Sequence, residues 1–131
     1  MPPAYLLDTS ACIPVLRNQT GLGKLPAPAR TGIPVIVAAE LWTGVKKNLR
    51  THPQQEARLE AFLSLFQLID FTLDAARHYA DIRADLETAG TPIGPLDLLI
   101  AAQARSLGAT LVTANVGEFK RVKGLKVYAW K

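Results

Sequence analysis

Three acidic side chains follow or interrupt apolar segments of the chain: Asp8, Glu40 and Asp97. Asp8 comes directly after Tyr5-Leu6-Leu7, Glu40 follows the apolar run 33–39, and Asp97 lies inside the apolar run 93–100. Carboxylate oxygens are the ligands that Mg²⁺ and Mn²⁺ prefer, and a metal-bound water can attack a phosphodiester. If the fold brings the three acids together, they would form a metal-dependent hydrolytic site.

Each acid also has a simpler explanation when it is taken alone. An acid in the first turn of a helix complements the helix dipole by roughly 0.3–1 kcal/mol, and for any single one this explanation is favoured. Two features favour a shared site. No charged residue precedes Asp8 in its strand, and the charge of Asp97 is costly within an apolar segment unless it has a partner. Three clustered carboxylates repel one another unless a cation lies between them.

An alternation of strands and helices is expected to position these acids. Hydrophobic patterns predict strands at 5–7, 68–69, 109–113 and 125–128, with another beginning at Ile33 that passes into a helix from about 38 to 49. Capping residues mark the other helices: Thr9 or Ser10 starts the first, Thr51 opens a capping box, Thr72 and Gly90 bound a long helix, and Pro95 and Gly108 bound the next.

Strands separated by helices imply an α/β fold with right-handed crossovers. We therefore expect one domain over residues 1–131, with a mainly parallel central sheet of about five strands and helices on both faces. Sites in such sheets lie beyond the carboxyl ends of the strands, where Asp8, Glu40 and Asn115 are expected to fall. The segment Gly21–Pro34, with three glycines and three prolines, is expected to be a loop and could form a mobile flap.

Composition limits the class of protein. The 131 residues are 49% hydrophobic, and no apolar run approaches the roughly 20 residues that span a bilayer. No secretory signal is visible, so a cytoplasmic protein is expected. Cys12 is the only cysteine, which excludes an intrachain disulfide and a thiolate cluster and favours a small core residue. His52 and His78 lack metal-ligand spacing and are interpreted as surface residues. The net charge of +4, concentrated in 46–50 and 120–131, suits a polyanionic partner or simply a solvated basic surface.

Four segments, in order, resemble the motifs of PIN-domain ribonucleases, and most closely the VapC toxins of bacterial type II toxin–antitoxin modules. They are Leu6-Leu7-Asp8-Thr9-Ser10, residues 39–45 (AELWTGV), residues 92–102 (PIGPLDLLIAA) and residues 111–115 (LVTAN). The resemblance covers essentially the whole chain, including 119–125. It implies that Asp8, Glu40 and Asp97 are the metal ligands, with Mg²⁺ or Mn²⁺ as the cofactor.

The fourth acid of many PIN domains is replaced by Asn115 in this chain. Asn115 is predicted to line the site as a neutral group, and Glu118 is the alternative that would act through the hydration shell of the metal. Thr9 and Thr113 resemble the family's hydroxyl residues, which would position a carboxylate or the attacking water. For Thr113, strand propensity explains the residue equally well.

Three further residues carry open interpretations. Arg83 would contact RNA or pair with an acid of the site, or it would pair with Glu87 at i+4 on its own helix. Trp42 and Trp130 would stack on bases, or they would belong to the core or to an interface.

The resemblance implies a metal-dependent endoribonuclease that acts as a toxin on structured RNA, such as tRNA or rRNA. It also implies a homodimer and a cognate VapB-like antitoxin that lays a segment into the acidic groove. A receiver domain would need paired acids after the first strand and a lysine after the last central one. A haloacid-dehalogenase-type phosphatase would need an acid at Ser10. A non-catalytic PIN-like domain that binds RNA or protein stays open because of Asn115.

Overall fold

The computed structural model describes residues 2–18 and 22–130. The strands are β1 (Tyr5–Leu7), β2 (Thr31–Pro34), β3 (Gln67–Ile69), β4 (Thr110–Thr113) and β5 (Lys126–Ala129). The helices are α1 (Thr9–Asn18), α2 (Val35–Lys47), α3 (Gln55–Leu63), α4 (Leu73–Ala89), α5 (Pro95–Leu107) and α6 (Val116–Phe119), with 3-10 turns η1 (Leu22–Lys24) and η2 (Pro28–Arg30).

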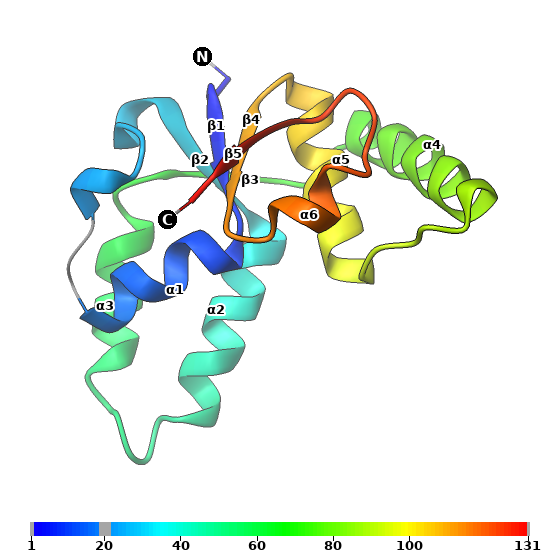
Figure 1. The fold of residues 1–131 in the computed structure, drawn as a ribbon. Helices are drawn as coiled ribbons and strands as arrows, with labels where there is room; N and C mark the ends of the chain where they lie inside the picture. The colour runs from blue at the N-terminus through cyan, green and yellow to red at the C-terminus, as the bar shows by residue number, and fades with distance from the viewer. Residues whose placement is uncertain (1, 19–21, 131) are drawn as a thin grey trace.

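The five strands form one parallel sheet in the order β3-β2-β1-β4-β5. The predicted parallel sheet of about five strands is therefore confirmed. The chain moves from β1 to β3 in one direction and then crosses to β4 and β5 on the other side of β1. Since crossovers of this kind are right-handed, the two directions place their helices on opposite faces. Figure 1 shows α1, α2 and α3 grouped on one side and α4, α5 and α6 on the other.

The two central strands are the most buried part of the sheet. Leu6 and Leu7 of β1 and Leu111 and Val112 of β4 are fully buried, as the uninterrupted apolar runs of a parallel sheet require. Helices cover them from both faces with apolar side chains, among them Val37 and Leu41 of α2 and Ile100 and Ala101 of α5. The carboxyl ends of β1 and β4 are thereby fixed side by side.

Most predicted helix ends are confirmed. Thr72 caps α4 by accepting a 3.1 Å hydrogen bond from the Ala75 N–H, and Gly90 ends the helix with a left-handed φ of 72°. Pro95 opens α5 and Gly108 ends it with φ 65°. The capping box at Thr51 was a wrong prediction. The Thr51 hydroxyl bonds to Asn48 O and His52 Nδ1, so α3 begins only at Gln55.

The boundary between β2 and α2 also differs from the prediction. The strand is Thr31–Pro34, inside the segment predicted to be a loop, and α2 begins at Val35. Pro34 lacks the N–H that would continue the strand and serves as the N-cap residue of the helix. Glu40 therefore lies on the second turn of a helix and not directly after a strand.

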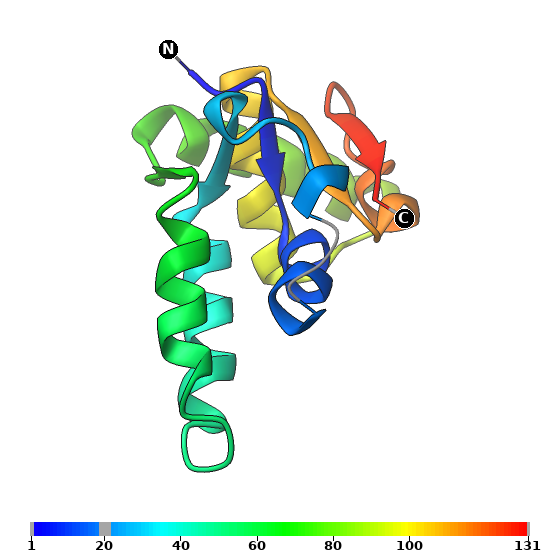
Figure 2. The same cartoon turned by 90° about the vertical axis from the view of Figure 1, so that its left-hand side faces the viewer.

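The rest of the predicted loop is ordered around two 3-10 turns, and Leu25 between them is buried in the core. Gly21 lies outside the described residues. Helices α2 and α3 pack against each other and project beyond the carboxyl edge of the sheet, which Figure 2 shows from a second side. None of the described helices has the length and apolar character needed to cross a membrane.

Candidate active site

Asp8 is the most buried acid at the carboxyl edge of the sheet, with 4% of its surface exposed. Its Oδ1 accepts hydrogen bonds from Ser10 Oγ (2.6 Å) and from the Ala11 N–H (3.0 Å), and its Oδ2 accepts one from Thr113 Oγ1. Burial raises the pKa of Asp8 above its usual range, although these hydrogen bonds act in the opposite direction. Three donors from two strand ends therefore hold this carboxylate in one orientation.

The hydroxyls beside Asp8 tie the end of β1 to the end of β4. Ser10 Oγ lies 3.3 Å from Thr113 Oγ1 and accepts a 2.9 Å hydrogen bond from the Ala114 N–H. Thr113 Oγ1 accepts from the Asn115 N–H at 2.9 Å. Thr113 thus contacts a carboxylate, as a positioning hydroxyl would. The sequence predicts Ser10 only as a helix cap and not as a site residue, although a hydroxyl two residues after an aspartate at a helix start is a signal for this contact.

Glu40 reaches the site from α2 because α1 packs against that helix. Thr9 Oγ1 donates a 2.7 Å hydrogen bond to Glu40 Oε1. Thr9, next to Asp8 in sequence, therefore links the first two acids of the predicted set.

Asp97 lies in the first turn of α5 and forms a side-chain hydrogen bond with Glu118 of α6. The pKa of Asp97 is raised to about 7, first by burial, then by the charge of Glu118 and the hydrogen bond with it, and then by the charges of Asp8 and Glu40. The Glu118 carboxylate accepts a 2.8 Å hydrogen bond from the Gly94 N–H, which is the main reason that its pKa is lowered. The charges of three other carboxylates therefore act on Asp97 at this edge.

Asn115 lies at the site, where it contacts another acid and does not simply replace the fourth one. Its Nδ2 donates a hydrogen bond to Glu118 Oε2. The side chain thereby holds the Glu118 carboxylate beside Asp97, so the two alternatives considered for the fourth position are both present and in contact.

The donor set suits a hard divalent cation. It consists of carboxylate oxygens, and among the described residues neither Asp8, Glu40, Asp97 nor Glu118 forms an ion pair with a lysine or arginine. In the same part of the chain, no three acidic, histidine or cysteine side chains converge closely enough to enclose a cation alone. Mg²⁺ commonly keeps several of its waters, so a site that supplies fewer direct ligands fits it. The uncompensated negative charge that raises the pKa of Asp97 is what such an ion would neutralise.

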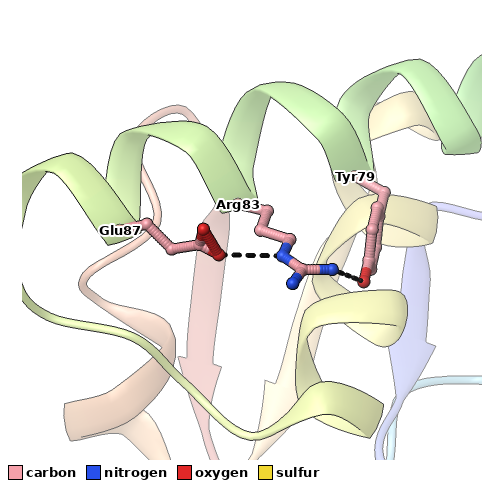
Figure 3. Close-up of polar contacts among 3 residues, drawn as sticks. All are labelled: Tyr79, Arg83 and Glu87. Atoms are coloured by element: carbon pink, nitrogen blue, oxygen red, sulfur yellow. Dashed lines mark hydrogen bonds and ion pairs between the residues drawn. The ribbon is translucent and has the colours of Figure 1, made fainter.

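Arg83 does not contact the acids of the site. Its Nε donates to Glu87 Oε2 at 2.8 Å and its Nη1 donates to the Tyr79 hydroxyl at 3.1 Å, along one exposed face of α4 (Figure 3). The interpretation of Arg83 as the partner of Glu87 at i+4 is confirmed.

The remaining interpretations concern side chains outside the site. Trp42 and Trp130 are half-buried and pack against the hydrophobic core, which favours their structural role. Cys12 is fully buried, as predicted, and burial together with the charge of Asp8 raises the pKa of its thiol. His52 is exposed, but His78 is half-buried and accepts a 2.8 Å hydrogen bond from Arg105 Nε, so its interpretation as a plain surface residue is wrong.

Known proteins resemble this chain over nearly its full length. The PIN domain family model matches residues 5–125. The chain is 37% identical to Ribonuclease VapC2 of Rickettsia felis, covering 96% of this chain and 97% of the relative. It is 35% identical to the tRNA(fMet)-specific endonuclease VapC of Salmonella typhimurium, with the same coverage.

A solved structure supports the same grouping. The DNA-bound VapBC complex of Salmonella typhimurium contains a chain that matches with a TM-score of 0.91 and 34% identity, covering 98% of this chain and 99% of that one. The fold, the ordered motifs and these full-length similarities together show that the chain belongs to the PIN-domain family, among the VapC ribonucleases.

Proposed function

We propose that this protein is a metal-dependent endoribonuclease, the toxin of a VapBC-type toxin–antitoxin module, and that Asp8, Glu40 and Asp97 hold its Mg²⁺ or Mn²⁺ ion. The observation that carries the proposal is the convergence of these acids and Glu118 at the carboxyl edge of the sheet, where burial and then the charges of the other three raise the pKa of Asp97 to about 7. Carboxylates that lie this close repel one another, and a bound cation would relieve that repulsion. Such a group of acids is typical of a cation-binding site.

The hydrogen bonds of the site indicate what each residue would do. Asp8 is fixed by Ser10, Ala11 and Thr113, so it is oriented before any ligand arrives. Thr9 holds Glu40 in place. A bound divalent ion would supply an activated water and neutralise charge on the scissile phosphate.

Asn115 and Glu118 complete the outer part of the site. Asn115 orients the Glu118 carboxylate, which lies next to Asp97. From there Glu118 can accept a hydrogen bond from a water in the hydration shell of the ion. A domain that only binds RNA or protein would not need this acidic group. The presence of the Glu118 carboxylate beside Asp97, held there by Asn115, supports the catalytic proposal over that alternative.

The partners follow from the relatives. The Salmonella typhimurium relative is named for cleavage of tRNA(fMet), and the matching structures are complexes of VapB with VapC. We expect this chain to cut a structured RNA, tRNA or rRNA, in the cytoplasm, as a homodimer and as one domain over residues 1–131. A cognate VapB-like antitoxin would place a basic side chain near the acids and so block the site.

A cleavage assay tests the proposal. Purified protein is incubated with labelled tRNA and rRNA in Mg²⁺ or Mn²⁺, and then with EDTA. Cleavage should require the metal, and Asp8→Asn should slow it by at least about a hundredfold, equivalent to roughly 2.7 kcal/mol of transition-state stabilisation. Asp81→Asn, which removes an exposed acid of α4, serves as the matched control. Cleavage that persists in EDTA, or in Asp8→Asn, would contradict the assignment of these residues.

A further inference from the structure

A cavity lies outside the group of acids. It has a volume of about 280 Å³ and is formed by the C-terminal half of α4, the C-terminal half of α5 and the turn that follows α6. Its floor is apolar and buried, because Ile82, Leu86 and Val122 are each 5% exposed or less. We call it the α4–α5 cavity.

The rim of the α4–α5 cavity is basic. Arg105, Arg121 and Lys123 line it, against Asp85 as the acid among the lining residues. In the described part of the chain, the ion pairs within 4.0 Å are Lys46–Glu56 and Arg83–Glu87, so none of the three cations forms an ion pair at that distance. The charge of Arg121 does act on Glu118, where it is one of the smaller causes of the lowered pKa. The cavity therefore carries an excess of positive charge that is suited to an anion.

Two of the cations are held in place by hydrogen bonds. Arg105 donates from Nε to His78 Nδ1 at 2.8 Å and from Nη1 to Lys123 O at 3.0 Å. Arg121 donates from Nη1 to Pro92 O at 3.1 Å. A guanidinium has five N–H donors, so each arginine keeps donors beyond these contacts. Such a fixed, partly satisfied guanidinium matches the geometry of a phosphate group, with little entropy left to lose on binding.

The cavity adjoins the candidate active site through one short segment. Arg121 contacts Pro92, and two residues later the Gly94 N–H donates to Glu118. This segment leads directly into α5 and Asp97. Arg121 also follows Glu118 by three residues, so the end of the cavity that Arg121 lines is the end nearer the acids, whereas Arg105 lies at the other end of α5 from Asp97. RNA bound among the acids would reach the cavity at its Arg121 end.

We propose that the α4–α5 cavity binds a backbone phosphate of the RNA substrate, near the phosphate that is cut. The two threonines of the rim, Thr88 and Thr91, add hydroxyl donors for the same phosphate, and the apolar floor can receive part of a ribose or base. This inference rests on the proposed ribonuclease function, since the cavity would bind another part of the RNA that is cut. The cavity contributes affinity along the strand and takes no part in the chemical step.

The test compares Lys123→Ala with Lys126→Ala. Both remove one exposed lysine from the same end of the chain, but Lys126 lies on β5 and does not line the cavity. The dissociation constant of a labelled single-stranded RNA is measured in EDTA at several salt concentrations. Lys123→Ala should weaken binding roughly threefold to fivefold and reduce the slope of log Kd against log salt by about 0.7, whereas Lys126→Ala should match the wild type. With metal present, Lys123→Ala should raise KM and leave kcat unchanged.

A second variant, Arg105→Lys, keeps the charge and removes the guanidinium fork. It should also weaken RNA binding, and its thermal unfolding confirms that the fold is retained. Equal Kd values and salt slopes for Lys123→Ala and Lys126→Ala would overturn the phosphate site. Binding of polyglutamate that depends on Lys123, without any such dependence for RNA, would overturn it in favour of an acidic protein partner. Lys123-dependent RNA binding by a wild type that cuts no RNA would leave this site standing and remove the proposed function instead.

Discussion

Asp97 is the acid of the site whose pKa is raised by both burial and the charges of its neighbours. Its pKa of about 7 is far above its unfolded value of about 3.8, because the folded protein buries the group near three other acids. Between those two pH values the folded state holds a proton that the unfolded chain has released. The free energy of unfolding of the metal-free protein must therefore fall as the pH rises through this window. The raised pKa of Asp8 acts in the same direction, and the lowered pKa of Glu118 acts in the opposite direction below about pH 4.5.

Asp97→Asn should remove most of this pH dependence. The amide keeps a donor for Glu118 and carries no charge, so in EDTA the variant should be more stable than the wild type at pH 8. At pH 5, where Asp97 is already protonated, the two proteins should be similar. Urea unfolding at both pH values measures the difference, and Asp81→Asn controls for the loss of an exposed acid. A wild type whose stability rises between pH 5 and pH 8 as much as that of Asp97→Asn would contradict this account.

The hydrogen bond from Thr9 to Glu40 is expected to affect metal affinity. Thr9→Val has nearly the same shape but cannot donate to Glu40, so Glu40 should lose its orientation. Affinity for Mn²⁺ should fall by about tenfold, in the range found for residues that orient metal ligands. Thr9→Ser keeps the hydroxyl and should behave as the wild type. Titration of Mn²⁺ into both variants distinguishes them, and equal affinities would show that Glu40 does not need this contact.

At the scale of elements, the sequence was most informative where one local signal determined the structure. Strand β4 consists of β-branched and apolar residues (TLVT), and α5 is bounded by Pro95 and Gly108, so both elements follow from local chain chemistry. The start of α2 was not predictable in that way. Val35, Ile36 and Val37 are β-branched and favour a strand, but packing of Val37 and Leu41 against the core places them in a helix.

The candidate site shows the same division. Asp8 and Asp97 were singled out because a charge in an apolar segment is costly, and the structure gives both acids polar partners. Glu118 stayed an alternative because α6 has only four residues, too few for a periodic pattern. Its contact with Gly94 joins positions 24 apart in sequence, and no local pattern reports such a contact. Whether these residues carry the reaction stays a prediction until the variants are measured.

The whole molecule combines an acidic site with a net charge of +4. The surplus of basic side chains favours the approach of RNA at long range, and in the proposed mechanism a cation among the acids would let a phosphate approach them. If the proposed function is correct, the protein should harm a cell when its acidic site is intact and no antitoxin blocks it. Inducing the wild type alone should therefore arrest bacterial growth, and Asp97→Asn at the same protein level should not. Growth curves with immunoblots test this, and equal growth of both strains would contradict the toxin assignment.

The position of β1 at the centre of the sheet makes the orientation of Asp8 depend on the order of synthesis. Asp8 is made at the start of the chain, yet its partner Thr113 is 105 residues away, and Leu7 pairs with Val112. Closing so long a loop is entropically costly and slow, and it waits until β4 has left the ribosome. A nascent or prematurely ended chain thus contains all three predicted ligands before it can assemble them. The topology therefore lets Thr113 orient Asp8 only after β4 has been synthesised.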